Sequence, residues 1–187
     1  MKRLLMFLVV GLLVMVSGAA AQTGVKLGVG ASFGMNIPLI QDDQAGGTEF
    51  GFKGRWGLGS FLVVEPNLTF AKWGKPDPID GVDLGIDGSK LNGIGLDVVL
   101  GNSPGAIGFK PYFVAGFGSY KVKNDDTGYD QSKMGWNAGL GFGVGLTPKF
   151  DLDLRGKFIV APQEAGSKKA VAVVGGVNFN FGSGIGY

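Results

Sequence analysis

The stretch Met134-Gly-Trp-Asn-Ala-Gly-Leu-Gly-Phe-Gly-Val-Gly-Leu146 has an apolar side chain at every even position and only glycine or asparagine at the odd ones. Successive side chains of a β-strand point to opposite faces, so this alternation predicts a strand with one apolar face and one nearly bare face. Strands of soluble domains average about five or six residues. A tilted strand that crosses a bilayer needs about nine to eleven. The length of this stretch therefore favours a membrane-spanning strand.

Seven other segments show the same alternation. In the segment 107–122 both faces carry apolar residues, and we place Phe113, Ala115 and Phe117 on the outer face. No segment shows a sustained 3.6-residue apolar stripe. The chain is therefore predicted to be all-β, an eight-stranded antiparallel up-and-down transmembrane β-barrel. The seven other segments are 24–36, 48–56, 61–73, 90–101, 107–122, 150–160 and 169–181.

The connections between these segments are expected to alternate in length. Short turns are predicted at 57–60, 102–106 and 147–149. Short periplasmic turns opposite longer extracellular loops are typical of bacterial outer-membrane barrels. This layout predicts that both termini face the periplasm. The longer, more polar connections are 37–47, 74–89, 123–134 and 161–168.

Residues 1–21 have the form of a cleavable signal peptide. Lys2 and Arg3 precede an apolar run, and small residues follow it up to Ala21. The run is too short for an ordinary spanning helix, and no cysteine follows it that could carry a lipid anchor. We expect cleavage before Gln22, export, and an outer-membrane β-barrel domain over residues 22–187.

Composition excludes several functions. Removing residues 1–21 takes away two of the 17 basic residues and none of the 15 acidic ones, so 15 of each remain. A chain without net charge or a basic cluster offers no field for nucleic acid. The absence of cysteine excludes a disulfide framework, and without histidine or cysteine the common nucleophile dyads and His-ligated metal sites are excluded. We therefore predict a protein that is not an enzyme, with no catalytic, cofactor-binding or metal site and no cofactor.

The alternation assigns each strand residue to one of two faces. An eight-stranded barrel encloses an interior just wide enough for side chains, and buried charges are tolerated chiefly when paired. We therefore predict a lumen charge network made of Lys26, Glu49, Lys53, Arg55, Glu65, Asp97, Asp151, Asp153, Arg155 and Lys157. The residues predicted to face lipid are Leu27, Val29, Phe52, Leu68, Phe70, Leu96, Val98, Trp136, Leu140, Phe142, Leu152, Leu154, Val173 and Phe179.

Aspartates are frequent in the predicted long connections. Calcium prefers several carboxylate and carbonyl oxygens, but the spacing here matches no EF-hand loop. We interpret these residues as solvent-exposed turn residues, with turns formed at Asp-Gly pairs, and cation binding is the alternative. They are Asp42, Asp43, Asp77, Asp80, Asp83, Asp87, Asp125, Asp126 and Asp130.

Three residues fit the strand pattern poorly. Pro66 and Pro111 fall within predicted strands, where each removes a ladder donor and implies a bulge or a nearby strand end. Trp73 has inward parity, although an interfacial aromatic belt would favour an outward position. A bulge before Trp73 would reconcile the two.

Several segments together resemble a known group. They are Gly24-Val-Lys-Leu-Gly-Val-Gly, Val64-Glu-Pro-Asn-Leu-Thr-Phe, Lys110-Pro-Tyr-Phe-Val-Ala-Gly-Phe-Gly, Gly139-Leu-Gly-Phe-Gly and Phe150-Asp-Leu-Asp-Leu-Arg-Gly-Lys-Phe. With these segments the chain resembles the small outer-membrane β-barrel family that includes the OmpA, OmpX and PorT-like proteins. The resemblance covers nearly the whole mature chain and implies location in a Gram-negative cell envelope. Members commonly end on an aromatic residue, whereas here Phe181 closes the last strand and Tyr187 ends the chain.

Our leading hypothesis is a non-enzymatic outer-membrane barrel with a structural or surface-interaction role and a lumen filled by polar and charged side chains. The alternatives are a narrow, porin-like ion-conducting pore and a soluble periplasmic lipocalin-like binding barrel. The expected partners are outer-membrane lipid, the barrel-assembly and periplasmic chaperone machinery during biogenesis, and an extracellular ligand bound through the loops. Nucleic acid is not an expected partner.

Overall fold

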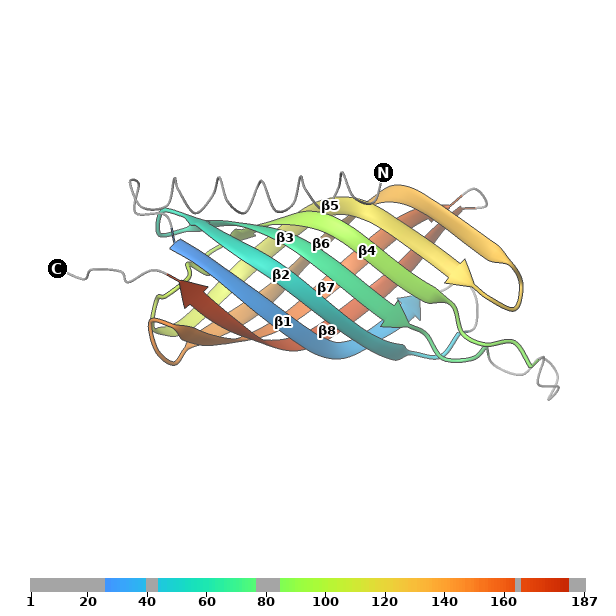
Figure 1. Cartoon of the computed structure of the whole chain (residues 1–187), viewed down its shortest axis with the longest axis horizontal. Helices are drawn as coiled ribbons and strands as arrows, with labels where there is room; N and C mark the ends of the chain where they lie inside the picture. The colour runs from blue at the N-terminus through green and yellow to red at the C-terminus, as the bar shows by residue number, and fades with distance from the viewer. Residues whose placement is uncertain (1–25, 40–43, 77–84, 164–165, 182–187) are drawn as a thin grey trace.

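The protein is a closed barrel of eight antiparallel strands in sequence order (Figure 1). The computed structural model describes residues 26–39, 44–76, 85–163 and 166–181. Each strand pairs with the next, and β8 pairs with β1 to close the sheet. The predicted fold class is confirmed. The strands are β1 (Lys26–Leu39), β2 (Gly47–Leu58), β3 (Leu62–Lys72), β4 (Lys90–Leu100), β5 (Gly108–Asn124), β6 (Tyr129–Gly145), β7 (Phe150–Gln163) and β8 (Gly166–Phe181).

The barrel has two unlike ends. We call the end at which β1 begins and β8 ends the terminal end, and the opposite end the hairpin end (Figure 1). Three connections lie at the terminal end: 59–61, 101–107 and 146–149. The predicted signal peptide, with its boundary at residues 21 and 22, lies outside the described residues. No helix in the described ranges is long and apolar enough to cross a membrane.

The expected alternation of short turns and long loops is wrong for two connections at the hairpin end. Strands β5 and β6 are joined by the four residues 125–128, and β7 ends only three residues before β8 begins. The β5–β6 ladder is continuous to Asn124 and Tyr129. The polar residues expected to form loops there continue the strands instead, because backbone pairing does not require apolar side chains.

The two strand prolines are accommodated without a bulge. Between β2 and β3 the pairing is interrupted opposite Pro66, from Lys53↔Asn67 to Trp56↔Val64, yet the register is the same on both sides. Pro111 lies beyond the part of β5 that pairs with β4, which starts at Phe113. The missing donor of Pro66 therefore interrupts the ladder locally, and neither proline shifts the strands.

Large apolar side chains from all eight strands point outward and form a belt around the barrel, which we call the apolar belt. Of the residues predicted to face lipid, Leu27, Leu96 and Phe179 are half-buried. In β5, Phe113 and Phe117 are exposed while Val114 is fully buried. The predicted lipid-facing residues that are exposed are Val29, Phe52, Leu68, Phe70, Val98, Trp136, Leu140, Phe142, Leu152, Leu154 and Val173.

Candidate functional site: the charged lumen and its closures

In the described part of the chain the lumen holds ten buried charged side chains, five basic and five acidic. Their equal number leaves the interior without net formal charge, which suits an environment that tolerates charges only in pairs. Nine of the ten are residues that strand parity assigns to the lumen. The predicted Lys26 is only half-buried at the start of β1. The ten are Glu49, Lys53, Arg55, Glu65, Asp97, Lys110, Asp151, Asp153, Arg155 and Lys157.

Arg155 on β7 is the centre of this network. Its Nη2 lies 2.8 Å from Glu65 Oε2 and 3.5 Å from Asp153 Oδ2, and its Nη1 lies 3.7 Å from Asp97 Oδ2. Its Nε donates a hydrogen bond of 2.9 Å to the Tyr112 hydroxyl. Because β3 and β7 stand opposite each other in the closed order, the contact of Arg155 with Glu65 spans the lumen.

A second arginine joins the walls nearer the terminal end. Arg55 on β2 donates from Nε to Glu65 Oε1 at 3.0 Å and from Nη1 to both carboxylate oxygens of Asp151, at 3.0 and 3.1 Å. Asn178 and Asn180 of β8 donate to the same carboxylate at 2.5 and 2.9 Å. Glu65 thus lies between two guanidinium groups, and Asp151 is almost surrounded by donors.

The bare face of β6 makes room for this packing. A Cβ added at Gly141 would lie 2.4 Å from the hydroxyl oxygen of Tyr112, and one added at Gly143 would lie 2.9 Å from Asn102 Oδ1. The Tyr112 hydroxyl donates to Asp153, which also pairs with Lys53. At Gly141 and Gly143 a larger residue would therefore collide with side chains from neighbouring segments, and at Gly139 and Gly145 with the backbone of a neighbouring segment.

The connection between β4 and β5 closes the terminal end. Asn102 and Ser103 are buried within it. The backbone carbonyl oxygen of Asn102 accepts a hydrogen bond of 2.9 Å from Arg55 Nη2. The carbonyl oxygen of Ser103 accepts one of 3.4 Å from Lys110 Nζ. Lys110 is the buried cation that the sequence analysis missed, and its even position in β5, opposite in parity to Phe109 and Phe113, is the signal that could have found it.

Apolar side chains fill the lumen at the hairpin end. Trp73 is 2 % exposed and packs with small and aliphatic residues of β3, β4, β5, β7 and β8. The suggested bulge before Trp73 is wrong, because the side chain points inward as its parity indicates. Its Nε1 donates to Asn36 Oδ1 at 2.7 Å, and Asn36 Nδ2 donates to Glu49 Oε2 at 2.6 Å. The cluster comprises Ala71, Trp73, Leu91, Tyr120, Val122, Ile159, Ala161, Ala170 and Ala172.

Connecting segments pack together above this cluster. Gln44 exchanges two hydrogen bonds with Ser89, from Gln44 Nε2 to the hydroxyl and from the Ser89 backbone nitrogen to Gln44 Oε1. Asn124 Nδ2 donates to the backbone oxygen of Asp87 and to the Ser89 hydroxyl. The segments around residues 44, 89 and 124 thus hold one another across the hairpin end of the barrel.

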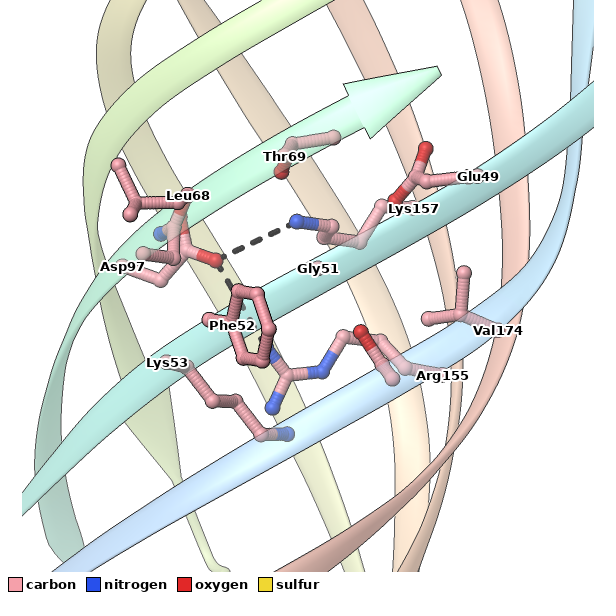
Figure 2. Close-up of a pocket in the computed structure, with 12 residues that line it drawn as sticks. Glu49, Gly51, Phe52, Lys53, Leu68, Thr69, Asp97, Arg155, Lys157 and Val174 are labelled. Carbon is pink, nitrogen blue, oxygen red and sulfur yellow. Dashed lines mark hydrogen bonds and ion pairs between the residues drawn. The ribbon is translucent and has the colours of Figure 1, made fainter. Parts of the chain in front are cut away.

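A small cavity lies between the charged side chains. A cavity in the middle of the lumen has a volume of about 20 Å³ for the centres of water molecules, and Glu49, Lys53, Asp97, Arg155 and Lys157 are among its lining residues. Figure 2 shows Arg155 and Lys157 converging on Asp97 in this cavity. A single water needs about 10 to 15 Å³ by this measure. The cavity is therefore of the size of one water.

The aspartates of the predicted loops are only partly described. Asp42, Asp43, Asp77, Asp80 and Asp83 lie outside the described residues. Among the described residues no group of three or more acidic side chains is placed to hold a metal ion. The remaining acids at the hairpin end are engaged locally: Asp130 lies 2.9 Å from Lys121, and Asp126 Oδ2 accepts a hydrogen bond from the backbone nitrogen of Asp87.

Asp125 bridges two lysines at the hairpin end, and this lowers its pKa. The hydrogen bond from Lys123 and that from Lys90 together hold the pKa of the Asp125 carboxyl at about 2, below its ordinary value of 3.8. The folded pKa is depressed, so the stabilisation is present above the unfolded value and is lost as the pH falls toward 2.

We expect the Asp125 carboxyl carbon to titrate in NMR with a midpoint near 2. Lys90→Gln combined with Lys123→Gln should return the midpoint toward that of free aspartate, and a wild-type midpoint already at the ordinary value would contradict the bridge.

Comparison with known proteins agrees with this geometry. The family model described as the outer membrane protein beta-barrel domain matches residues 6–181. The chain belongs to this outer-membrane β-barrel family. The protein is thus an outer-membrane barrel with transmembrane β-strands. No curated protein matches the chain.

Solved structures of small outer-membrane barrels share the fold of this family member. Neisserial surface protein A superposes with a TM-score of 0.64 at 18 % identity, covering 84 % of this chain and 97 % of the other. OprG of Pseudomonas aeruginosa gives a TM-score of 0.56 at 13 % identity, covering 84 % and 96 %. The N-terminal β-barrel domain of OprF from the same organism gives 0.53 at 21 % identity, covering 83 % and 97 %. At these identities the likeness shows the fold alone.

Proposed function

We propose that this protein is a non-conducting, non-enzymatic outer-membrane barrel with a structural or surface-interaction role. The observation that carries the proposal is the closed lumen. The β4–β5 connection fills the terminal end, paired charges fill the middle, and the cluster around Trp73 fills the hairpin end. Such an interior joins opposite walls and stiffens the barrel, and it leaves the outer surface and the hairpin end available for contacts.

The ion-conducting alternative is disfavoured by the apolar cluster rather than by the charges. A hydrophobic constriction excludes water and hydrated ions. Trp73, Leu91, Val122 and Ile159 form such a constriction at full burial. The lipocalin-like alternative requires an apolar interior around a ligand, whereas here the interior carries the charges and the outer surface is apolar.

Planar-bilayer recording tests the proposal. We expect no discrete conductance steps from the inserted wild-type protein or from Arg155→Gln in concentrated KCl. Heat-modifiable migration of the same sample on a gel verifies that folded barrels were added. Wild-type steps whose ion selectivity changes in Arg155→Gln would overturn the proposal and favour the pore, because Arg155 would then line the conducting path.

We further propose the partners and the orientation that follow from this role. The apolar belt contacts outer-membrane lipid, and barrel-assembly and periplasmic chaperone machinery act during biogenesis. Both termini face the periplasm, which leaves the hairpin end on the outside and makes its connections the surface for an extracellular ligand. Protease cleavage at the hairpin end of intact cells supports this orientation, and cleavage only after the outer membrane is opened contradicts it.

A further inference from the structure

Three outward-facing lysines lie side by side on adjacent strands at the hairpin end. Lys72 of β3 is the cross-strand partner of Lys90 of β4, and Lys90 is the partner of Lys123 of β5. We call these three residues the lysine row. Like charges directly opposite each other destabilise a sheet, so their alignment across three strands requires a compensating partner.

The lysine row borders the apolar belt. Phe70 precedes Lys72 by two residues on the same face, and Phe70 pairs with Asn92, which pairs with Lys121. With a rise of about 3.3 Å per residue, the row lies about 7 Å beyond the last apolar level of β3. Lys72 is exposed, and the Lys90 and Lys123 side chains are 45 % and 44 % exposed. On β4 and β5 the last exposed apolar residues of this face, Ile94 and Phe117, lie four and six residues from the row, about 13 and 20 Å along the strands. The lysine row therefore lies on the polar side of the apolar belt.

Carboxylates in the described part of the chain neutralise the row only in part. Asp125 pairs with both Lys90 and Lys123, and Asp130 pairs with Lys121. Four lysines thus share two carboxylates. Among the described residues Asp125 is the one carboxylate that pairs with the row, and it contacts Lys90 and Lys123 but not Lys72.

The direction of the lysines distinguishes between possible anions. Their side chains point sideways from the wall of the barrel, on the same face as Phe70, Ile94 and Phe117. A macromolecule that approaches along the barrel axis meets the packed segments around Gln44, Ser89 and Asn124 first. With the apolar belt in hydrocarbon, the wall at this level faces the interfacial layer of the membrane. Anionic headgroups attract interfacial lysines, and lysine side chains near the interface extend their ammonium groups toward the headgroups.

We propose that Lys72, Lys90 and Lys123 form a binding site for phosphate-bearing lipid headgroups, with the acyl chains of the bound lipid packed on the apolar belt beside Phe70, Ile94 and Phe117. This site is independent of whether the lumen conducts ions. It makes β3–β5 the side of the barrel that selects its lipid neighbours.

Lipid retention measured by native mass spectrometry tests the site. The folded protein is reconstituted in nanodiscs of phosphatidylcholine with a minor share of phosphatidylglycerol, then released with its bound lipid. We expect the wild type to retain phosphatidylglycerol in excess of its share. In Lys72→Gln/Lys123→Gln the preference should fall by roughly fivefold for each lysine removed.

The matched control is Lys149→Gln/Lys169→Gln, which removes two positive charges outside the row. It should keep the wild-type preference. Equal retention by the wild type and the Lys72→Gln/Lys123→Gln variant, or an equal loss in the control, would overturn the proposal. Inorganic phosphate at the same phosphate concentration should not displace the lipid. If it does, the row is a general anion site, and the assignment to membrane lipid is wrong. Heat-modifiable migration verifies that each variant is folded.

Discussion

Arg155→Met should lower the free energy of unfolding by about 3–5 kcal/mol, because removing one partner of a buried ion pair leaves uncompensated charge behind. Glu65, Asp97 and Asp153 all lie within 4 Å of the Arg155 guanidinium. Their side chains are at most 2 % exposed, so bulk water does not screen the charge that is left behind. Reversible denaturant unfolding in lipid vesicles, followed by tryptophan fluorescence, measures the change.

The partner variant Glu65→Gln makes this prediction specific to the network. Glu65 receives hydrogen bonds from both Arg55 and Arg155. The double variant should be less destabilised than the sum of the two single variants, because neutralising Glu65 removes part of the charge that Arg155→Met leaves unpaired. Lys121→Met, which breaks the exposed pair with Asp130, should cost at most about 1 kcal/mol. A similarly small loss in Arg155→Met would contradict a lumen held by charge pairing.

Leu140→Arg should destabilise the barrel by roughly 2–4 kcal/mol, the cost of an arginine on the lipid face near the midplane. Leu140 is 68 % exposed and lies at the middle of the outward series from Met134 to Leu146 on β6. In a soluble protein a charged residue at such an exposed position would cost almost nothing. The loss of stability therefore distinguishes hydrocarbon from water around Leu140, and the same unfolding assay in vesicles measures it.

Ser132→Arg is the depth control on the same strand and the same face. Ser132 lies beyond Met134 toward the hairpin end, where its hydroxyl is 3.0 Å from that of Ser119 on the exposed surface. Near the interface the cost of arginine falls to about 0–1 kcal/mol. Equal penalties at 132 and 140 would show that the apolar belt does not sit in hydrocarbon as placed here.

The lumen tolerates substitutions less well than its small side chains indicate. Judged from the sequence, Asn137→Ser is a modest change between glycines on the bare face of β6. In the structure Asn137 Nδ2 donates to Asp97 Oδ1 at 2.9 Å and to the Tyr120 hydroxyl at 3.1 Å. Serine is too short to keep both bonds, and a buried carboxylate that loses a donor is costly. The residue type alone could not reveal this, because both partners come from other strands.

The hydrophobic pattern of each segment was sufficient to predict that a strand exists, but not where the strand begins and ends. The alternation in 134–146 correctly predicts a strand, yet β6 begins at Tyr129, within the polar residues expected to form a loop. Where β5 and β6 extend past the apolar belt, their side chains become polar while the backbone ladder continues. The hydrophobic pattern of a strand depends on the medium around it, so the alternation ends where hydrocarbon gives way to polar headgroups and water.

Membrane-barrel character, strand number and the face of most residues follow from the sequence itself, because a period of two fixes opposite faces within one strand without reference to any other strand. Only the closed structure decides which charges meet. Arg155 finds Glu65 across the lumen because closing eight strands in a fixed register brings β7 opposite β3. The inward position of Trp73, the closure of the terminal end by Asn102 and the alignment of Lys72, Lys90 and Lys123 were likewise set by pairing between strands. Contacts between residues far apart in the chain depend on barrel register and curvature, which no single strand encodes.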